Sequence, residues 1–113
     1  MALQCAKQSP RECEDGSIRW YEGDTFDLVF EFNIQDENDR PITIGATDSI
    51  EVCFKDKNGT IIHEFVGIGS NTVTMQFTEE ISNKFKVGEY KYRARFRGEY
   101  IRTLMRKNKV VVE

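Results

Sequence analysis

The sequence is poor in several residues on which catalysis and metal binding most often depend. It has 113 residues, with one histidine, two prolines and three cysteines. His63 has only a neighbouring glutamate, which is weak support for a catalytic or metal site. Cys5, Cys13 and Cys53 cannot all pair within one chain and are too far apart for a zinc finger. We expect no enzyme, no metal and no cofactor, with free thiols in a reducing compartment. A local disulfide between Cys5 and Cys13 is the alternative in an oxidising one.

Long apolar runs are also missing. No window approaches about 18 consecutive apolar residues, which excludes a membrane-spanning helix. Residues 1–14 carry several charges and no apolar stretch, so we expect no secretory signal and a protein made in a cytosol. A net charge of only -3 and an aromatic content of 12% argue against disorder. The length fits one domain.

Alternation of apolar and polar residues is the strongest signal present. It predicts half-buried strands, because successive side chains of a strand point to opposite faces. The clearest example has apolar side chains at every even position from Phe26 to Ile34. Comparable alternation occurs at Ile50–Phe54, Val73–Phe77 and Tyr90–Phe96. No stretch of similar length shows a helical period.

Turn residues separate these segments. Asp36–Pro41 predicts a polar turn, and Asn58-Gly59 predicts a tight hairpin. Thr78 is a candidate N-cap for one short helix before Phe85. Tyr100–Met105 and Val110–Val112 are predicted as two closing strands, separated by Lys107-Asn108-Lys109.

Two packed sheets would bury the apolar faces of so many strands. We therefore predict an all-β fold, an immunoglobulin-like antiparallel β-sandwich of seven or eight strands with one short helical connector. The sandwich is expected over residues 16–113 as a single domain, after a flexible arm over residues 1–15.

Two local patterns suggest ligands only weakly. Gly67-Ile68-Gly69 lacks the third glycine and the helix of a dinucleotide-binding loop. Asp36-Glu37-Asn38-Asp39 superficially resembles the calcium-binding run of cadherin linkers, but it lies between two strands of one domain. We expect a solvated turn there.

Charge is distributed unevenly. Residues 1–83 hold 6 Lys/Arg and 16 Asp/Glu, whereas residues 84–113 hold 10 Lys/Arg and 3 Asp/Glu. Alternation places Lys91, Arg93, Arg95 and Arg97 on the outward face of one strand, and we add Arg102 on the next to this candidate interaction face. The cations could pair with acidic rows of the same domain such as Asp27 and Glu31, or with an acidic face of another subunit. Nucleic acid is a weaker alternative, because the ridge has no outward aromatic residues for base stacking.

The order of strands and turns carries a resemblance. Its elements are Gly23-Asp24 before the long strand, the Asp36–Pro41 turn with Ile42-Thr43-Ile44, the Ile50–Gly59 hairpin, Phe77-Thr78-Glu79-Glu80, Phe85–Tyr92, Arg102-Thr103-Leu104 and Val110–Val112. Over about residues 17–113 they resemble the N-terminal immunoglobulin-like domain of tailed-phage upper-baseplate proteins and their prophage relatives. Asp39 stands where that family usually has glycine, and Val87 where it usually has proline.

This resemblance implies a non-enzymatic structural module of a phage or prophage tail or baseplate. Its partners would be other tail or baseplate subunits, or further copies of itself, with no nucleic acid and no membrane. Its location would be the virion, assembled in the bacterial cytoplasm. The alternative is a carbohydrate- or cell-surface-binding module in which Trp20, Tyr21 and Tyr100 line an exposed platform; a buried Trp20 would argue against it.

Overall fold

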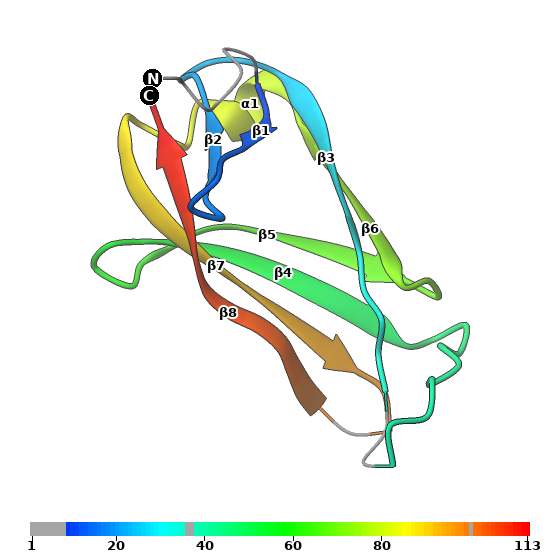
Figure 1. Ribbon diagram of the computed structural model, residues 1–113. Helices are drawn as coiled ribbons and strands as arrows, with labels where there is room; N and C mark the ends of the chain where they lie inside the picture. Colours follow the sequence, from blue (N-terminus) through cyan, green and yellow to red (C-terminus); the bar gives the residue numbers. More distant parts are fainter. Residues whose placement is uncertain (1–8, 36–37, 100) are drawn as a thin grey trace.

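The alternating segments form strands in two facing sheets (Figure 1). The computed structural model describes residues 9–35, 38–99 and 101–113, with the backbone alone for 105–107. The described elements are β1 (Arg11–Glu12), β2 (Ile18–Trp20), β3 (Phe26–Glu31), β4 (Ser49–Asp56), β5 (Ile61–Ile68), β6 (Thr72–Phe77), α1 (Glu79–Ser82), β7 (Gly88–Arg97) and β8 (Ile101–Val112). The predicted β-sandwich with one short helix is confirmed.

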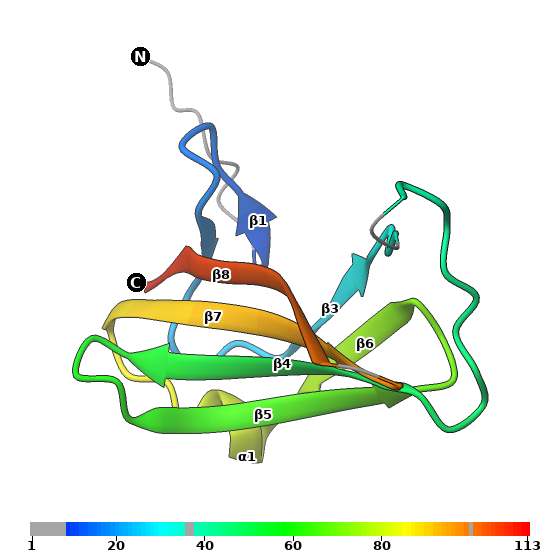
Figure 2. The same cartoon turned by 90° about the horizontal axis from the view of Figure 1, so that it is seen from below.

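The two sheets differ in size. One has six strands in the order β1-β2-β8-β7-β4-β5, and Figure 2 shows β8, β7, β4 and β5 in succession. The other is formed by β3 and β6. The chain crosses between the sheets after β2, β3, β5 and β6. All pairs are antiparallel except β2 and β8, which run parallel with Ile18 opposite Val110.

An aromatic cluster fills the space between the sheets. Phe77 of β6 is only 1% exposed and joins them, because its ring lies 5.0 Å from Trp20 of the larger sheet and 4.7 Å from Phe26 of the smaller one. Phe54 and Phe85 are fully buried beside it, with ring centroids 5.8 and 5.7 Å from Phe77. Burial of these rings from water contributes to the hydrophobic stabilisation of the fold.

Turn chemistry follows the sequence. Gly59 has φ 84° in the β4–β5 hairpin, a conformation that costs glycine little. The Thr78 hydroxyl accepts a hydrogen bond from the Ile81 backbone N–H and caps α1 as expected. Asp39 has φ 61°, in the left-handed region that favours glycine. This is the position at which the resembling family usually carries glycine.

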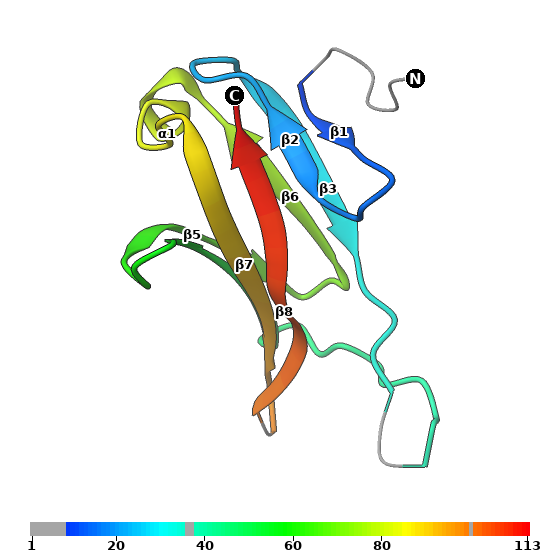
Figure 3. The ribbon, with the colours of Figure 1, turned by 60° about the vertical axis from the view of Figure 1, so that its left-hand side comes forward.

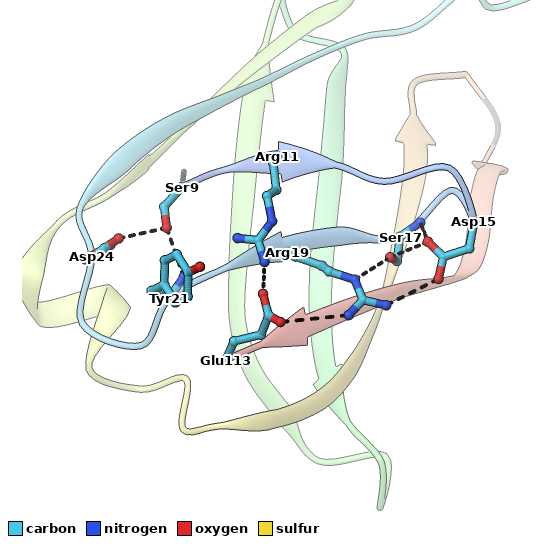
Figure 4. Close-up of polar contacts among 8 residues, drawn as sticks. All are labelled: Ser9, Arg11, Asp15, Ser17, Arg19, Tyr21, Asp24 and Glu113. Atoms are coloured by element: carbon cyan, nitrogen blue, oxygen red, sulfur yellow. Dashed lines mark hydrogen bonds and ion pairs between the residues drawn. The ribbon is translucent and has the colours of Figure 1, made fainter. Parts of the chain in front are cut away.

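The prediction of a flexible arm over residues 1–15 is wrong for residues 9–15, the part of it that the structure describes. Arg11 and Glu12 form β1, at the edge of the larger sheet beside β2 (Figure 3). Arg11 is 8% exposed, lies over the Tyr21 ring and forms an ion pair with Glu113, as Figure 4 shows. Arg19 extends this network. Its guanidinium nitrogens lie 3.3 Å from a carboxylate oxygen of Asp15 and 4.0 Å from one of Glu113. Ion pairs, and not an alternating row of apolar side chains, hold this segment in place. The hydrophobic pattern of the sequence therefore did not predict a strand here.

The two closing strands predicted from the sequence are one strand. β8 runs without interruption through Lys107-Asn108-Lys109, the segment expected to be a turn. Register shifts between Tyr92 and Arg95 of β7 mark a β-bulge, and β8 accommodates its extra residues there. The polar triplet therefore lies in a bulged strand, which polar composition alone does not distinguish from a turn.

The cysteines also differ from the expectation of free thiols. Cys13 is disulfide-bonded and buried. Cys5 lies outside the described residues. Cys53 is free and 2% exposed, and burial raises the pKa of its thiol.

Candidate functional site

The outer surface of the larger sheet carries the predicted row of cations. In β7 the inward side chains Tyr90, Tyr92, Ala94 and Phe96 are all buried. The outward side chains between and beside them are exposed or half-buried: Lys91, Arg93, Arg95 and Arg97. The pleat of the strand therefore places these four cations on one face, as the sequence predicted. We call this surface the basic face; it also includes the neighbouring Lys55 of β4 and Lys109 of β8.

Strand register places three lysines directly opposite one another on the basic face. Lys91 of β7 pairs with Lys55 of β4 on one side and with Lys109 of β8 on the other. Like charges directly opposite across strands destabilise a sheet. Lys109 is partly compensated, because its Nζ lies 2.9 Å from an oxygen of Glu89. That contact lowers the pKa of the Glu89 carboxyl by hydrogen bonding and charge attraction.

One of the four outward cations of β7 has an acidic partner in the described part of the chain. The Arg97 Nε donates a hydrogen bond to Glu51 of β4, a side chain that is only 18% exposed. Arg95 lies directly opposite Glu51, but its Nε is buried without a hydrogen-bond partner. The expected pairing with Asp27 and Glu31 does not occur, because those residues lie on β3 in the other sheet. Lys91, Arg93 and Arg95 form no ion pair with the described residues.

Arg102 does not belong to the basic face. It pairs with Phe96, an inward residue, and its guanidinium donates to the backbone carbonyl of Gln35 near the end of the sandwich. Its inclusion in the candidate interaction face is therefore corrected. The β7–β8 register decides this point, and the sequence pattern of one strand does not fix the register of the next.

The outer surface of the smaller sheet has the opposite charge. Its outward side chains are Asp27, Val29 and Glu31 of β3, opposite Gln76, Thr74 and Thr72 of β6. The set contains two carboxylates and no cation. Val29, between the two carboxylates, is 56% exposed. We call this surface the acidic face. The sequence predicted Asp27 and Glu31 as an outward acidic row, but as possible partners of the cations within the same domain.

Two depressions bear on possible ligands. One of about 350 Å³ adjoins the basic face and is lined by Lys55, Lys57, Lys91 and Arg93 together with Cys53, Asp56, Gly59 and Tyr92. The larger, of about 480 Å³, lies between residues 32–35, 41–44 and 69–71, and no ionisable side chain lines its described wall. Within the described ranges no three His, Cys, Asp or Glu side chains are grouped as metal ligands. Asp36 and Glu37 of the acidic run lie outside those ranges.

The remaining sequence candidates are placed as follows. Trp20 is fully buried, so it contributes nothing to an aromatic platform for carbohydrate, and Tyr100 lies outside the described residues. Tyr21 is 37% exposed beneath Arg11. His63 is half-buried, and its Nδ1 lies 3.2 Å from the Lys84 ammonium. Burial and that ammonium lower the pKa of the imidazole, so it is neutral at pH 7.

Comparisons with protein-family models, with curated proteins and with solved structures found no match. In the part of the chain that the structure describes, no helix has the length and apolar character needed to span a membrane.

Proposed function

We propose that this protein is a structural module of a phage or prophage tail or baseplate, which acts by binding other subunits. The observation that carries the proposal is the basic face. Lys91, Arg93 and Arg95 lie together on the outward face of β7 and form no ion pair with the described residues. Strand register adds Lys55 and Lys109 beside them. Such a surface favours an acidic protein partner, because complementary charge guides association and fixes register.

The order of strands and turns supports the tail assignment. The β-sandwich and the Thr78-capped short helix are features that the resemblance to upper-baseplate N-terminal domains leads us to expect. The positive φ of Asp39 supports the proposal further, since glycine, which the family usually has at this position, adopts such a conformation readily.

The proposal is tested by asking whether the protein is part of a particle. Prophage is induced in the bacterium that encodes the protein, and particles are purified by density gradient and examined by quantitative mass spectrometry. We expect the protein in the particle fraction at a fixed ratio to other tail proteins. Recovery only in the soluble fraction, with particles present, contradicts the proposal.

A pair of variants connects this result to the basic face. Arg93→Glu/Arg95→Glu reverses two ridge charges and is expected to reduce incorporation into particles. Lys84→Glu/Lys86→Glu reverses two exposed charges between α1 and β7 and serves as the matched control. Circular dichroism establishes that both variants fold. Equal incorporation of the two removes the basic face from the proposal.

A further inference from the structure

The two outer surfaces of the sandwich have complementary charges. Around β7, the outward cations Lys55, Lys91, Arg93, Arg95, Arg97 and Lys109 outnumber the outward carboxylates Glu51, Glu64 and Glu89. On the other surface, the charged side chains that β3 and β6 present are the carboxylates Asp27 and Glu31. The surfaces belong to opposite sheets of the sandwich, so one copy cannot bring its own two faces together.

The spacing of the charges also matches. Asp27 and Glu31 are four residues apart on one strand, which separates them by about 13 Å on the same side of the sheet. Lys91 and Arg95 are four residues apart on β7 and therefore have the same separation of about 13 Å. Between the carboxylates lies exposed Val29, and between the cations lies Arg93, whose aliphatic stem can cover an apolar side chain. Asp27 and Glu31 of one copy can therefore meet Lys91 and Arg95 of another at the same time.

The lysine row gives the basic face a reason to bind carboxylates. Lys91 has a lysine directly opposite it on each side, and neither Lys91 nor Lys55 forms an ion pair with the described residues. A carboxylate from outside the domain would relieve that repulsion.

We infer that the acidic face of one copy docks on the basic face of the next, giving a head-to-tail assembly of this chain. The inference rests on the proposed function and names the partner of the basic face. Because the two mating surfaces are different, the contact is heterologous, and repetition closes into a ring or continues as a filament. Two strands of six residues offer a flat area of only about 20 by 10 Å, well below the roughly 800 Å² per partner of a stable interface. A single contact is therefore weak and salt-sensitive.

Charge exchange provides the test. Variant A, Asp27→Lys/Glu31→Lys, makes both faces basic; variant B, Lys91→Glu/Arg95→Glu, reverses the two matching cations. Sedimentation velocity is measured over a concentration series at about 0.05 M and about 0.5 M salt, where screening differs strongly. We expect the wild type to associate beyond a dimer at low salt, and A and B alone to associate about tenfold more weakly. An equimolar mixture of A and B should recover association, because each reversed face then meets an opposite charge.

Controls separate charge matching from damage to the fold. Neutral variants Asp27→Asn/Glu31→Gln and Lys91→Gln/Arg95→Gln should each weaken association. Mixing them restores only the contact between the two unaltered faces, so that mixture should stop at a dimer, whereas the mixture of A and B should continue beyond one. A wild type that stays monomeric at all concentrations, a wild-type assembly that stops at a dimer, or no recovery in the A and B mixture overturns the inference. A monomer leaves the particle experiment unaffected, since another tail subunit can supply the carboxylates. Absence from particles together with recovered association overturns the proposed function alone.

Discussion

Neutralising Lys91 should stabilise the isolated domain. Lys91 faces Lys55 and Lys109 across its two neighbouring strands. With ammonium groups about 8 Å apart in water, each pair repels by about 0.5 kcal/mol. Two pairs give at most about 1 kcal/mol, because Glu89 already offsets part of the Lys109 charge. Lys91→Gln should therefore raise the free energy of unfolding by about 0.5–1 kcal/mol. Lys91→Glu should raise the free energy of unfolding somewhat more, because it replaces repulsion of the two lysines by attraction. The gain should be less than double that of Lys91→Gln, because the new carboxylate is repelled by Glu89, two residues away on the same face.

The assay is urea unfolding at about 0.02 M and about 0.5 M salt. With a denaturant slope of about 1.5 kcal/mol/M, a gain of 1 kcal/mol raises the urea midpoint by about 0.7 M. At 0.5 M salt the Debye length is about 4 Å, so most of the gain should disappear. Arg93→Gln is the matched control, because its β4 neighbour is the uncharged Cys53. No gain for Lys91→Gln at low salt, or an equal gain at both salts, would refute the electrostatic reasoning.

Three further predictions concern the core and the β1–β2 edge. Phe77→Ala should cost about 3–5 kcal/mol in urea unfolding, since it empties the contact between the sheets, and Phe77→Leu should cost clearly less. The Asp15 carboxyl should titrate by NMR with a pKa of about 2, because the Ser17 side chain and backbone and then Arg19 hydrogen-bond to its charged form. Because this pKa is depressed in the folded state, the associated stability should be complete above about pH 4 and lost as pH falls toward 2, and Ser17→Ala should raise the pKa toward 3.8. Trp20 should emit at short wavelength and resist acrylamide quenching, and a red, quenchable emission would contradict its burial.

The sequence predicted those features that depend on one strand at a time. Alternation identified the inward and outward rows of β3, β4, β6 and β7, and it placed Lys91, Arg93, Arg95 and Arg97 on one face. Residues suited to a hairpin and a helix cap predicted the turn at Gly59 and the helix after Thr78. These features follow from local chemistry, which the sequence contains directly.

Features that depend on register between strands were not predictable in the same way. The partner of Arg97 is Glu51, and neither strand alone says that they are neighbours. Arg102 points inward because of how the β7–β8 hairpin closes. The lysine row exists only because three strands come into one register. The short strand at Arg11 is held by charge and by pairing with one antiparallel neighbour, so it has no periodic pattern of its own.

The parallel contact between β2 and β8 has a kinetic consequence. The β4–β5 and β7–β8 hairpins close over a few residues, whereas Ile18 meets Val110 only after a loop of roughly 90 residues has closed. The entropy of closing that loop is recovered only once most of the sandwich exists, so β2 should dock late and detach early. Trp20 lies in this strand, and its fluorescence therefore reports the last step of folding rather than the first collapse.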